Sequence, residues 1–201
     1  MNIAVFISGK GSNLKALINA QIKREISKGK ITLVVSNNSK ALGLEIAKKA
    51  NIETFVLEKK DFKNKKEYES NIIKKLEERN IEVIVLAGFM QILSGFFIEK
   101  YKNKILNIHP SLLPAFKGAQ AIKDAFNYGV KVTGVTVHFV TEKIDYGPII
   151  DQQIVEIEEK DTLESLEKKI HEKEHIMYKK ALDLFVREKI KIQGRKVIIL
   201  K

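Results

Sequence analysis

The chain has 201 residues, and hydrophobic side chains occupy 44% of them, so it can bury a sizeable core and is not a disordered chain. It contains no cysteine, which excludes disulfide frameworks and thiolate zinc sites. The net charge is +11, but most basic residues are lysines interleaved with glutamate, a pattern typical of solvated helix surfaces. Nucleic-acid binding favours clustered arginine and aromatic residues, so we expect no nucleic-acid partner, whereas small anionic substrates remain compatible with the charge.

The N-terminal stretch MNIAVFISGKGSN lacks the basic start, long apolar run and small-residue cleavage site of a signal peptide. No apolar run approaches the roughly 20 residues that a membrane-spanning helix needs. The sequence therefore predicts a soluble, cytoplasmic protein without a membrane partner.

Apolar, β-rich runs alternate with segments of helical period through the first two thirds of the chain. The predicted strands are 2–8, 31–36, 53–57, 82–87 and 104–108. The predicted helices are 12–25, 40–50, 64–79, 94–101 and 118–128. This alternation predicts a parallel α/β sheet, and the almost continuously apolar strands near residues 2 and 82 should be central, covered on both faces.

The pattern changes after residue 130. Two extended runs, 132–140 and 148–156, precede a long helix whose start resembles a capping box formed by Asp161 and Glu164. The helix should turn one apolar stripe inward, made of Leu163, Leu166, Ile170, Met177, Ala181 and Leu184. A hairpin with its turn at Gln193 and Gly194 follows. Without internal repeats or linkers, the simplest expectation is one domain over 1–201, a Rossmann-like, open and mostly parallel sheet with helices on both faces.

The first strand-to-helix turn reads SGKGSN, residues 8–13. Glycines allow a sharp turn, and free amides at a helix N-terminus bind phosphate. The alternative is a tight turn with Ser12 or Asn13 as the N-cap. Leu14 replaces the third glycine of a dinucleotide fingerprint, and no Lys-Ser or Lys-Thr pair follows as in a P-loop. The turn therefore indicates a single terminal phosphate, not NAD or ATP.

Asn107 and His109 interrupt an apolar strand just before Pro110. Residues two apart on a strand point to the same side, so both project near the carboxyl end, where open α/β sheets bind ligands. A lone strand histidine is usually a hydrogen-bonded core residue, but an amide beside an imidazole also suits acyl transfer. Asp145 lies in a Gly-Pro turn; it is either a turn former or a carboxylate that faces His109 and favours its cationic form.

Residues 171–175, HEKEH, match the zinc motif H-E-x-x-H. Helical spacing places His171 and His175 on one face, but no convincing third ligand follows and a parallel α/β sheet is an unusual setting, so we expect no metal. Glu174 falls on the apolar stripe, where a carboxylate needs a partner: a ligand amine or hydroxyl, or an internal ion pair.

The stretch LAGFMQILS, residues 86–94, leaves a predicted buried strand through Gly88. It is expected to expose Phe89, Met90, Ile92 and Leu93 before the next helix. These side chains are either ordinary core or an apolar slot for a flat heterocycle.

Together, ISGKGSN, IVLAGFMQILS, LNIHPSLLPAFKG, VTGVTVHFV and DYGPII closely resemble phosphoribosylglycinamide formyltransferases, the folate-dependent enzymes of purine synthesis. The resemblance covers essentially the whole chain, and the Asn-x-His-Pro-Ser-Leu-Leu-Pro block is typical of folate formyltransferases. It implies direct transfer of the formyl group of 10-formyltetrahydrofolate to the amine of glycinamide ribonucleotide, without a metal or a covalent enzyme intermediate. Residues 1–100 would form the phosphate-binding half and 101–201 the folate and catalytic half.

The resemblance also implies roles for individual residues. Asn107 and cationic His109 would stabilise an oxyanion, and Asp145 would support His109 and help to relay a proton. The remaining implied contacts are Gly11, Ser12 and Asn13 to the phosphate, Glu174 to the ribose or glycinamide part, and Met90, Gln91, Ile92 and Leu93, with segment 141–145, to the folate. Lys65 and Gln91 stand where some relatives carry arginine, which leaves the contacts to the folate's glutamate tail open.

Sister families share the catalytic block. A methionyl-tRNA formyltransferase would need a further C-terminal nucleic-acid-binding domain, and a formyltetrahydrofolate deformylase an extra N-terminal regulatory domain, neither of which is expected in this sequence. A non-catalytic nucleotide-binding module would explain the glycine turn but gives the three polar residues no common task. We expect a monomer or a homodimer.

Overall fold

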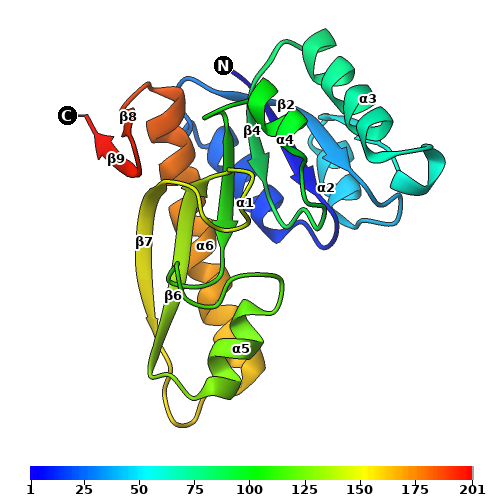
Figure 1. Cartoon of the computed structure of the whole chain (residues 1–201). Coiled ribbons are helices and arrows are strands. Elements are labelled where there is room, and N and C mark those ends of the chain that lie inside the picture. Colours follow the sequence, from blue (N-terminus) through cyan, green and yellow to red (C-terminus); the bar gives the residue numbers. More distant parts are fainter. Residues whose placement is uncertain (201) are drawn as a thin grey trace.

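The computed structural model describes residues 1–200, and its centre is one seven-stranded sheet in the order β3-β2-β1-β4-β5-β6-β7 (Figure 1). Five strands run parallel: β1 (Asn2–Ile7), β2 (Lys30–Ser36), β3 (Glu53–Val56), β4 (Ile81–Leu86) and β5 (Ile105–His109). Two antiparallel strands, β6 (Val132–Phe139) and β7 (Ile149–Glu156), extend the sheet beyond β5. The predicted open, mostly parallel α/β sheet is confirmed.

Helices cover both faces of the sheet, as predicted (Figure 1). One face carries α1 (Ser12–Ile22), α2 (Gly43–Lys49) and α6 (Leu163–Val186), and the other carries α3 (Lys65–Glu78) and α4 (Gly95–Lys100). Strand β1 shows why: Ile3, Val5 and Ile7 pack towards the first set, whereas Ala4 and Phe6 pack towards the second. The apolar run is continuous because both faces are buried.

Shorter elements complete the chain. A 3-10 turn, Lys59–Asp61, precedes α3; α5 (Ala121–Tyr128) packs against α6; and β8 (Ile190–Gln193) pairs with β9 (Lys196–Ile199) as a hairpin. The turn of this hairpin is Gly194 and Arg195, one residue beyond the predicted position. No helix within residues 1–200 has the length and apolar character needed to cross a membrane.

The start of α6 differs from the prediction. Its capping box consists of Thr162 and Ser165: the Thr162 hydroxyl accepts from the Ser165 amide at 3.1 Å, and Ser165 Oγ accepts from the Thr162 amide at 2.9 Å. Asp161 lies one residue before the cap, where it accepts from Ser165 Oγ and pairs with Lys169. A serine hydroxyl at the third position therefore replaces the carboxylate that was expected of Glu164.

The inward stripe of α6 is buried as predicted at its centre, whereas Leu163 and Leu184 are only half-buried. Sequence reasoning missed Tyr178, which is buried on the same face. Its hydroxyl lies 2.8 Å from the Leu86 carbonyl oxygen of β4 and 3.0 Å from that of Leu106 in β5. Helix α6 thus holds together the two strands that end at the candidate site.

Candidate active site

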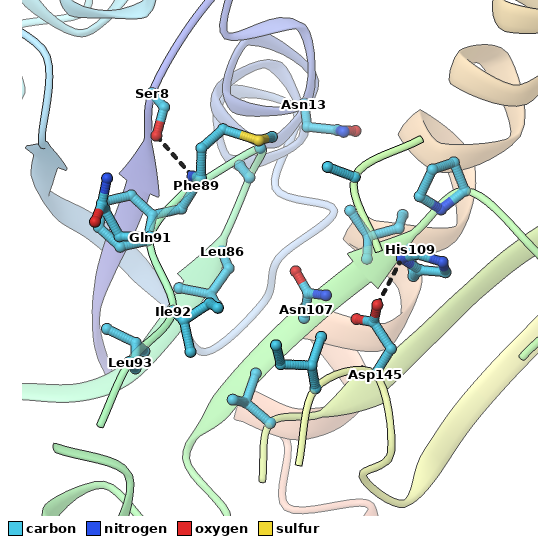
Figure 2. A pocket seen from close by; sticks show the side chains of 18 of the residues that line it. Ser8, Asn13, Leu86, Phe89, Gln91, Ile92, Leu93, Asn107, His109 and Asp145 are labelled. Carbon is cyan, nitrogen blue, oxygen red and sulfur yellow. Dashed lines mark hydrogen bonds and ion pairs between the residues drawn. The ribbon is translucent and has the colours of Figure 1, made fainter. Parts of the chain in front are cut away.

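A cavity of about 630 Å³ opens at the carboxyl ends of β1, β4 and β5 (Figure 2). This is the edge where the parallel strands stop and their polar end residues face one space. The residues predicted from sequence that line it are Gly11, Ser12, Asn13, Met90, Gln91, Ile92, Leu93, Asn107, His109, Asp145 and Glu174. Only Lys65 among the predicted site residues lies outside the lining of this cavity.

Asn107 and His109 both belong to β5, and Asp145 reaches them from the segment between β6 and β7. The carboxylate of Asp145 points towards the imidazole of His109, with Oδ2 at 3.5 Å from Nδ1 (Figure 2). The same Oδ2 accepts from the Gly118 amide at 2.8 Å. Asp145 adopts φ 48°, in the left-handed region, so the backbone turns sharply to present this side chain.

The imidazole of His109 is buried, and both of its nitrogens face oxygen acceptors. Nε2 lies 2.8 Å from the Phe116 carbonyl oxygen, and Nδ1 faces Asp145. These two contacts hold the ring in one orientation in the lining of the cavity.

His138 completes this polar cluster, and sequence reasoning did not single it out. It lies opposite Asn107 in the β5–β6 pair, with Nε2 at 3.2 Å from Asn107 Nδ2 and 3.8 Å from Asp145 Oδ1. Burial lowers the pKa of His138, which favours the neutral ring, and its Nδ1 donates to the Phe139 carbonyl at 2.8 Å. In the neutral ring, Nε2 accepts a hydrogen bond from Asn107 Nδ2, so the amide nitrogen of Asn107 faces His138. The second N–H of this amide is left for a ligand.

The only sequence signal for His138 was a histidine inside the apolar strand VTVHFV. Its role depends on the register of β6 against β5, and a predicted strand range does not supply a register.

The glycine turn ends in an open helix N-terminus. Gly11 occupies the N-cap position of α1 with φ 78°, and no side chain in the described part of the chain caps the helix. A Cβ at Gly11 would lie 2.7 Å from Gly43 Cα, so close packing against the start of α2 also requires glycine there. The alternative of Ser12 or Asn13 as N-cap is therefore wrong, and the uncapped first turn of α1 lies in the lining of the cavity.

The Asn13 side chain instead turns to Glu174. Asn13 Nδ2 donates to Glu174 Oε2 at 2.9 Å, while Asn13 Oδ1 is buried without a partner among residues 1–200. Glu174 is 3% exposed, and the same Oε2 lies 2.8 Å from His171 Nδ1. The internal ion pair expected of Glu174 is present, with His171 as its partner. Glu174 also lines the cavity, and its contact with a ligand stays a prediction.

The HEKEH motif does not assemble a zinc site within residues 1–200, where no group of three potential ligand side chains is arranged around one point. Its histidines have different surroundings: the contact with Glu174 raises the pKa of His171, and burial lowers that of His175. Glu174 lies about one helical turn after His171 and forms an ion pair with it.

Segment 89–93 forms the apolar wall of the cavity, held by a bond from the Met90 amide to Ser8 Oγ at 2.8 Å (Figure 2). Met90 and Ile92 are 65% and 60% exposed. The expectation that all four apolar side chains are exposed is wrong for Leu93, which is 6% exposed, and for Phe89, which packs on Phe6 with ring centroids 5.2 Å apart. The exposed pair is the candidate slot for a flat heterocycle.

Lys65 lines a smaller neighbouring cavity of about 260 Å³, which also contacts segment 89–93. Its ammonium lies 3.8 Å from Glu69 Oε1, and Glu69 is buried and bound to the Ser94 amide and hydroxyl. Lys65 is therefore at the outer rim of the apolar wall, separate from the polar cluster.

Comparison with known proteins agrees with this geometry. Residues 1–182 match the profile of the family described as Formyl transferase. A phosphoribosylglycinamide formyltransferase of Bacillus subtilis is 45% identical over 87% of this chain and 89% of its own length; that of Escherichia coli is 38% identical over 96% and 90%. The crystal structure of glycinamide ribonucleotide transformylase 1 from Symbiobacterium toebii superposes with a TM-score of 0.97 at 38% identity, covering 100% of this chain and 94% of that one.

Longer relatives also match. The trifunctional purine biosynthetic protein adenosine-3 of Gallus gallus is 49% identical over 92% of this chain, which spans only 18% of that protein. A formyltetrahydrofolate deformylase structure from Pseudomonas syringae has a TM-score of 0.92 at 26% identity, with 66% of its chain covered. The extent of the family match and the high coverage of the two bacterial relatives show that this chain belongs to the formyl transferase family.

Proposed function

We propose that the protein transfers the formyl group of 10-formyltetrahydrofolate to the amine of glycinamide ribonucleotide, a step of purine biosynthesis. The observation that carries this proposal is the meeting of Asn107, His109 and Asp145 in one cavity with an open helix N-terminus. The bacterial relatives named phosphoribosylglycinamide formyltransferase, matched over most of their length, support the choice of acceptor. We place the reaction in the cytoplasm, carried out by a monomer or a homodimer without nucleic acid.

The ribonucleotide binds at the α1 side of the cavity. Its phosphate takes the free amides at Gly11, Ser12 and Asn13, where the helix dipole favours an anion. Glu174 then faces the ribose or glycinamide part, which supplies the hydroxyl and amine donors that a buried carboxylate requires. Asn13 Oδ1, buried without a partner in the described chain, is a second acceptor beside it.

The folate binds along segment 89–93, with Met90 and Ile92 against its flat rings. The segment that ends at Asp145 forms the opposite wall, where Val140 and Ile144 add apolar contact. Gln91 and Lys65 lie towards the outer end, where a glutamate tail would leave the cavity. An ammonium at Lys65 attracts a carboxylate but lacks the two-pronged geometry of arginine.

The reaction requires from the protein mainly hydrogen-bond donors and charges that are held close to the reacting atoms. In the transfer, a bond forms between the amine nitrogen and the formyl carbon, the bond from that carbon to the folate N10 breaks, and one proton passes from the amine to N10. Asn107 donates its free N–H to the formyl oxygen, where negative charge develops. Cationic His109 stabilises the same charge at short range while its Nε2 stays hydrogen-bonded to the Phe116 carbonyl. Asp145 holds the imidazolium in place and relays the proton through water.

One assay tests this function. Purified protein, 10-formyltetrahydrofolate and glycinamide ribonucleotide are mixed, and release of tetrahydrofolate is followed with and without the ribonucleotide. We expect release only when the ribonucleotide is present. Release at the same rate without it would contradict the proposal and favour hydrolysis, the reaction named for the deformylase relative.

The zinc alternative for HEKEH is tested in the same assay. Because Glu174 and His171 are engaged with each other, we expect formyl transfer to continue at an unchanged rate in excess chelator. Loss of activity in chelator, restored by added zinc, would contradict a metal-free reaction.

A further inference from the structure

Tyr146 directly follows Asp145, and its ring is the meeting point of three cationic side chains. Lys143 Nζ lies 4.2 Å from the ring centroid, Lys117 Nζ lies 4.8 Å from it, and the guanidinium carbon of Arg195 lies 4.2 Å from it. Cations over an aromatic face are attracted by the ring quadrupole. Three segments that are distant in sequence are thus joined at the residue next to the candidate catalytic carboxylate.

Arg195 makes the most specific of these contacts. Besides covering the ring, its Nη1 donates to the Tyr146 carbonyl oxygen at 2.9 Å. Arg195 stands at the turn of the β8–β9 hairpin, which lies outside the residues that match the family profile. The hairpin therefore holds both the side chain and the backbone of Tyr146.

The backbone around Asp145 needs such a restraint. Asp145 has φ 48°, an uncommon conformation for a residue other than glycine, and a Cβ at Gly147 would lie 1.7 Å from the Phe139 carbonyl oxygen. Tyr146 is itself 40% exposed, so burial alone holds it weakly. On the other side, Lys117 precedes Gly118, whose amide binds Asp145 Oδ2.

We propose that Arg195 and Tyr146 form a clamp that fixes Asp145 between His109 and His138, so that Arg195 is a positioning residue for the reaction. This inference rests on the proposed formyl transfer. Neither Arg195 nor Tyr146 lines the cavity, so the clamp acts through Asp145 and not by touching a substrate. Small displacements of a catalytic group reduce the rate of the chemical step more than they reduce binding.

The kinetic test compares Arg195→Ala, Arg195→Lys and Lys196→Ala. We expect Arg195→Ala to lower kcat about threefold to tenfold, the range expected for one lost hydrogen bond, with KM for the ribonucleotide unchanged. Arg195→Lys should recover part of the loss, because it keeps a cation and a donor but not the guanidinium fork. Lys196→Ala removes the same charge from the neighbouring exposed position and should leave kcat unchanged.

NMR spectroscopy of the histidine rings tests the clamp without a measurement of turnover. The chain has four histidines, of which His109 and His138 face Asp145, whereas His171 and His175 lie on α6. We expect Arg195→Ala to shift the NMR signals of the first two rings and to leave those of the other two in place. Tyr146→Leu should do the same, and Tyr146→Phe, which keeps the ring, should not.

The two tests separate two kinds of failure. Unchanged His109 and His138 signals together with wild-type kcat in Arg195→Ala would overturn the clamp while formyl transfer stands. Equal losses in Arg195→Ala and Lys196→Ala would also overturn it, because a general effect of charge or hairpin stability would then suffice. If the wild-type protein transfers no formyl group, the proposed function fails instead, and shifted ring signals would still establish that Arg195 positions Asp145.

Discussion

The two ends of the cavity are built in opposite ways. The polar end consists of Asn107, His109, His138 and Asp145. The two imidazoles are buried and the other two side chains are partly buried. All four contact one another or nearby backbone groups. At the apolar end, Met90 and Ile92 are mostly exposed, and a hydrogen bond from the Met90 amide to Ser8 Oγ holds their segment. The first end is fixed in advance, whereas the second presents surface that a ligand must cover.

This difference matches the role that we propose for each end. Stabilising a developing charge requires donors whose orientation is set before the reaction, and buried hydrogen-bond networks supply that orientation. A flat apolar ligand requires mainly area, and a flexible thioether such as Met90 adapts to its shape. Mutations should therefore affect kcat at the polar end and KM at the apolar end.

The largest effect is expected at His109 and Asp145. Replacing His109 with Asn removes the imidazole proposed to stabilise the developing charge, and Asp145→Asn removes the carboxylate that faces it, so each should reduce kcat by about 100- to 1000-fold or more. Steady-state release of tetrahydrofolate measures the loss. Binding of the ribonucleotide, measured by calorimetry, should persist in both variants, because the proposed phosphate site at Gly11 is separate from these residues. Turnover close to wild type in either variant would refute the assignment of the polar end.

A smaller loss is expected at His138, which acts through Asn107. His138→Leu removes the acceptor that orients the amide and should lower kcat about threefold to tenfold, the range expected for one lost hydrogen bond. His138→Gln offers a carbonyl oxygen in its place and should recover part of the rate. Identical kinetics for the Leu and Gln variants would show that orientation of Asn107 does not depend on this bond.

His138 should also make stability depend on pH. Burial lowers its pKa from 6.5 in the folded protein. Below pH 6.5 the histidine therefore binds a proton more readily in the unfolded chain than in the folded protein, and the free energy of unfolding falls as pH falls. Above 6.5 this contribution is constant. The slope from one such group is at most about 1.4 kcal/mol per pH unit.

Denaturant unfolding at about pH 7.5 and about pH 5.5 isolates this effect when wild type is compared with His138→Gln. The variant should lose less stability on acidification. The comparison is needed because His175, whose pKa is also lowered, acts in the same direction, and His171, whose pKa is raised, acts in the opposite one. A loss equal to that of the wild type would contradict a neutral, buried His138.

The smallest effect is expected at the apolar end. Met90→Ser removes apolar area that the folate would cover and should raise its KM about twofold to fivefold with kcat retained, whereas Met90→Leu should be close to wild type. Titration of the folate in the steady-state assay measures both. A loss confined to kcat in Met90→Ser would remove the distinction between the two ends.

Much of this site could be predicted from local sequence. The alternation of strands and helices gave the parallel sheet, and the two-residue spacing of Asn107 and His109 placed both at one strand end, because strand geometry has a fixed period. The glycine turn before α1 was recognisable because the backbone freedom of glycine is also a local property. The errors at the α6 cap and the hairpin turn are shifts of one residue, because several consecutive polar residues could form the cap or the turn.

Other features depended on the three-dimensional structure alone. His138 meets Asn107 across 31 residues of sequence, Gly118 meets Asp145 across 27, and Arg195 meets Tyr146 across 49. Each of these contacts requires the register of two antiparallel strands or the path of a loop, neither of which any local pattern encodes. The sequence by itself determined which elements form and which strand ends carry polar side chains, because those properties are periodic and local. Tertiary structure decided that His138 meets Asn107 at these strand ends and that Arg195 meets Tyr146 beside them, because long-range packing brings these residues together.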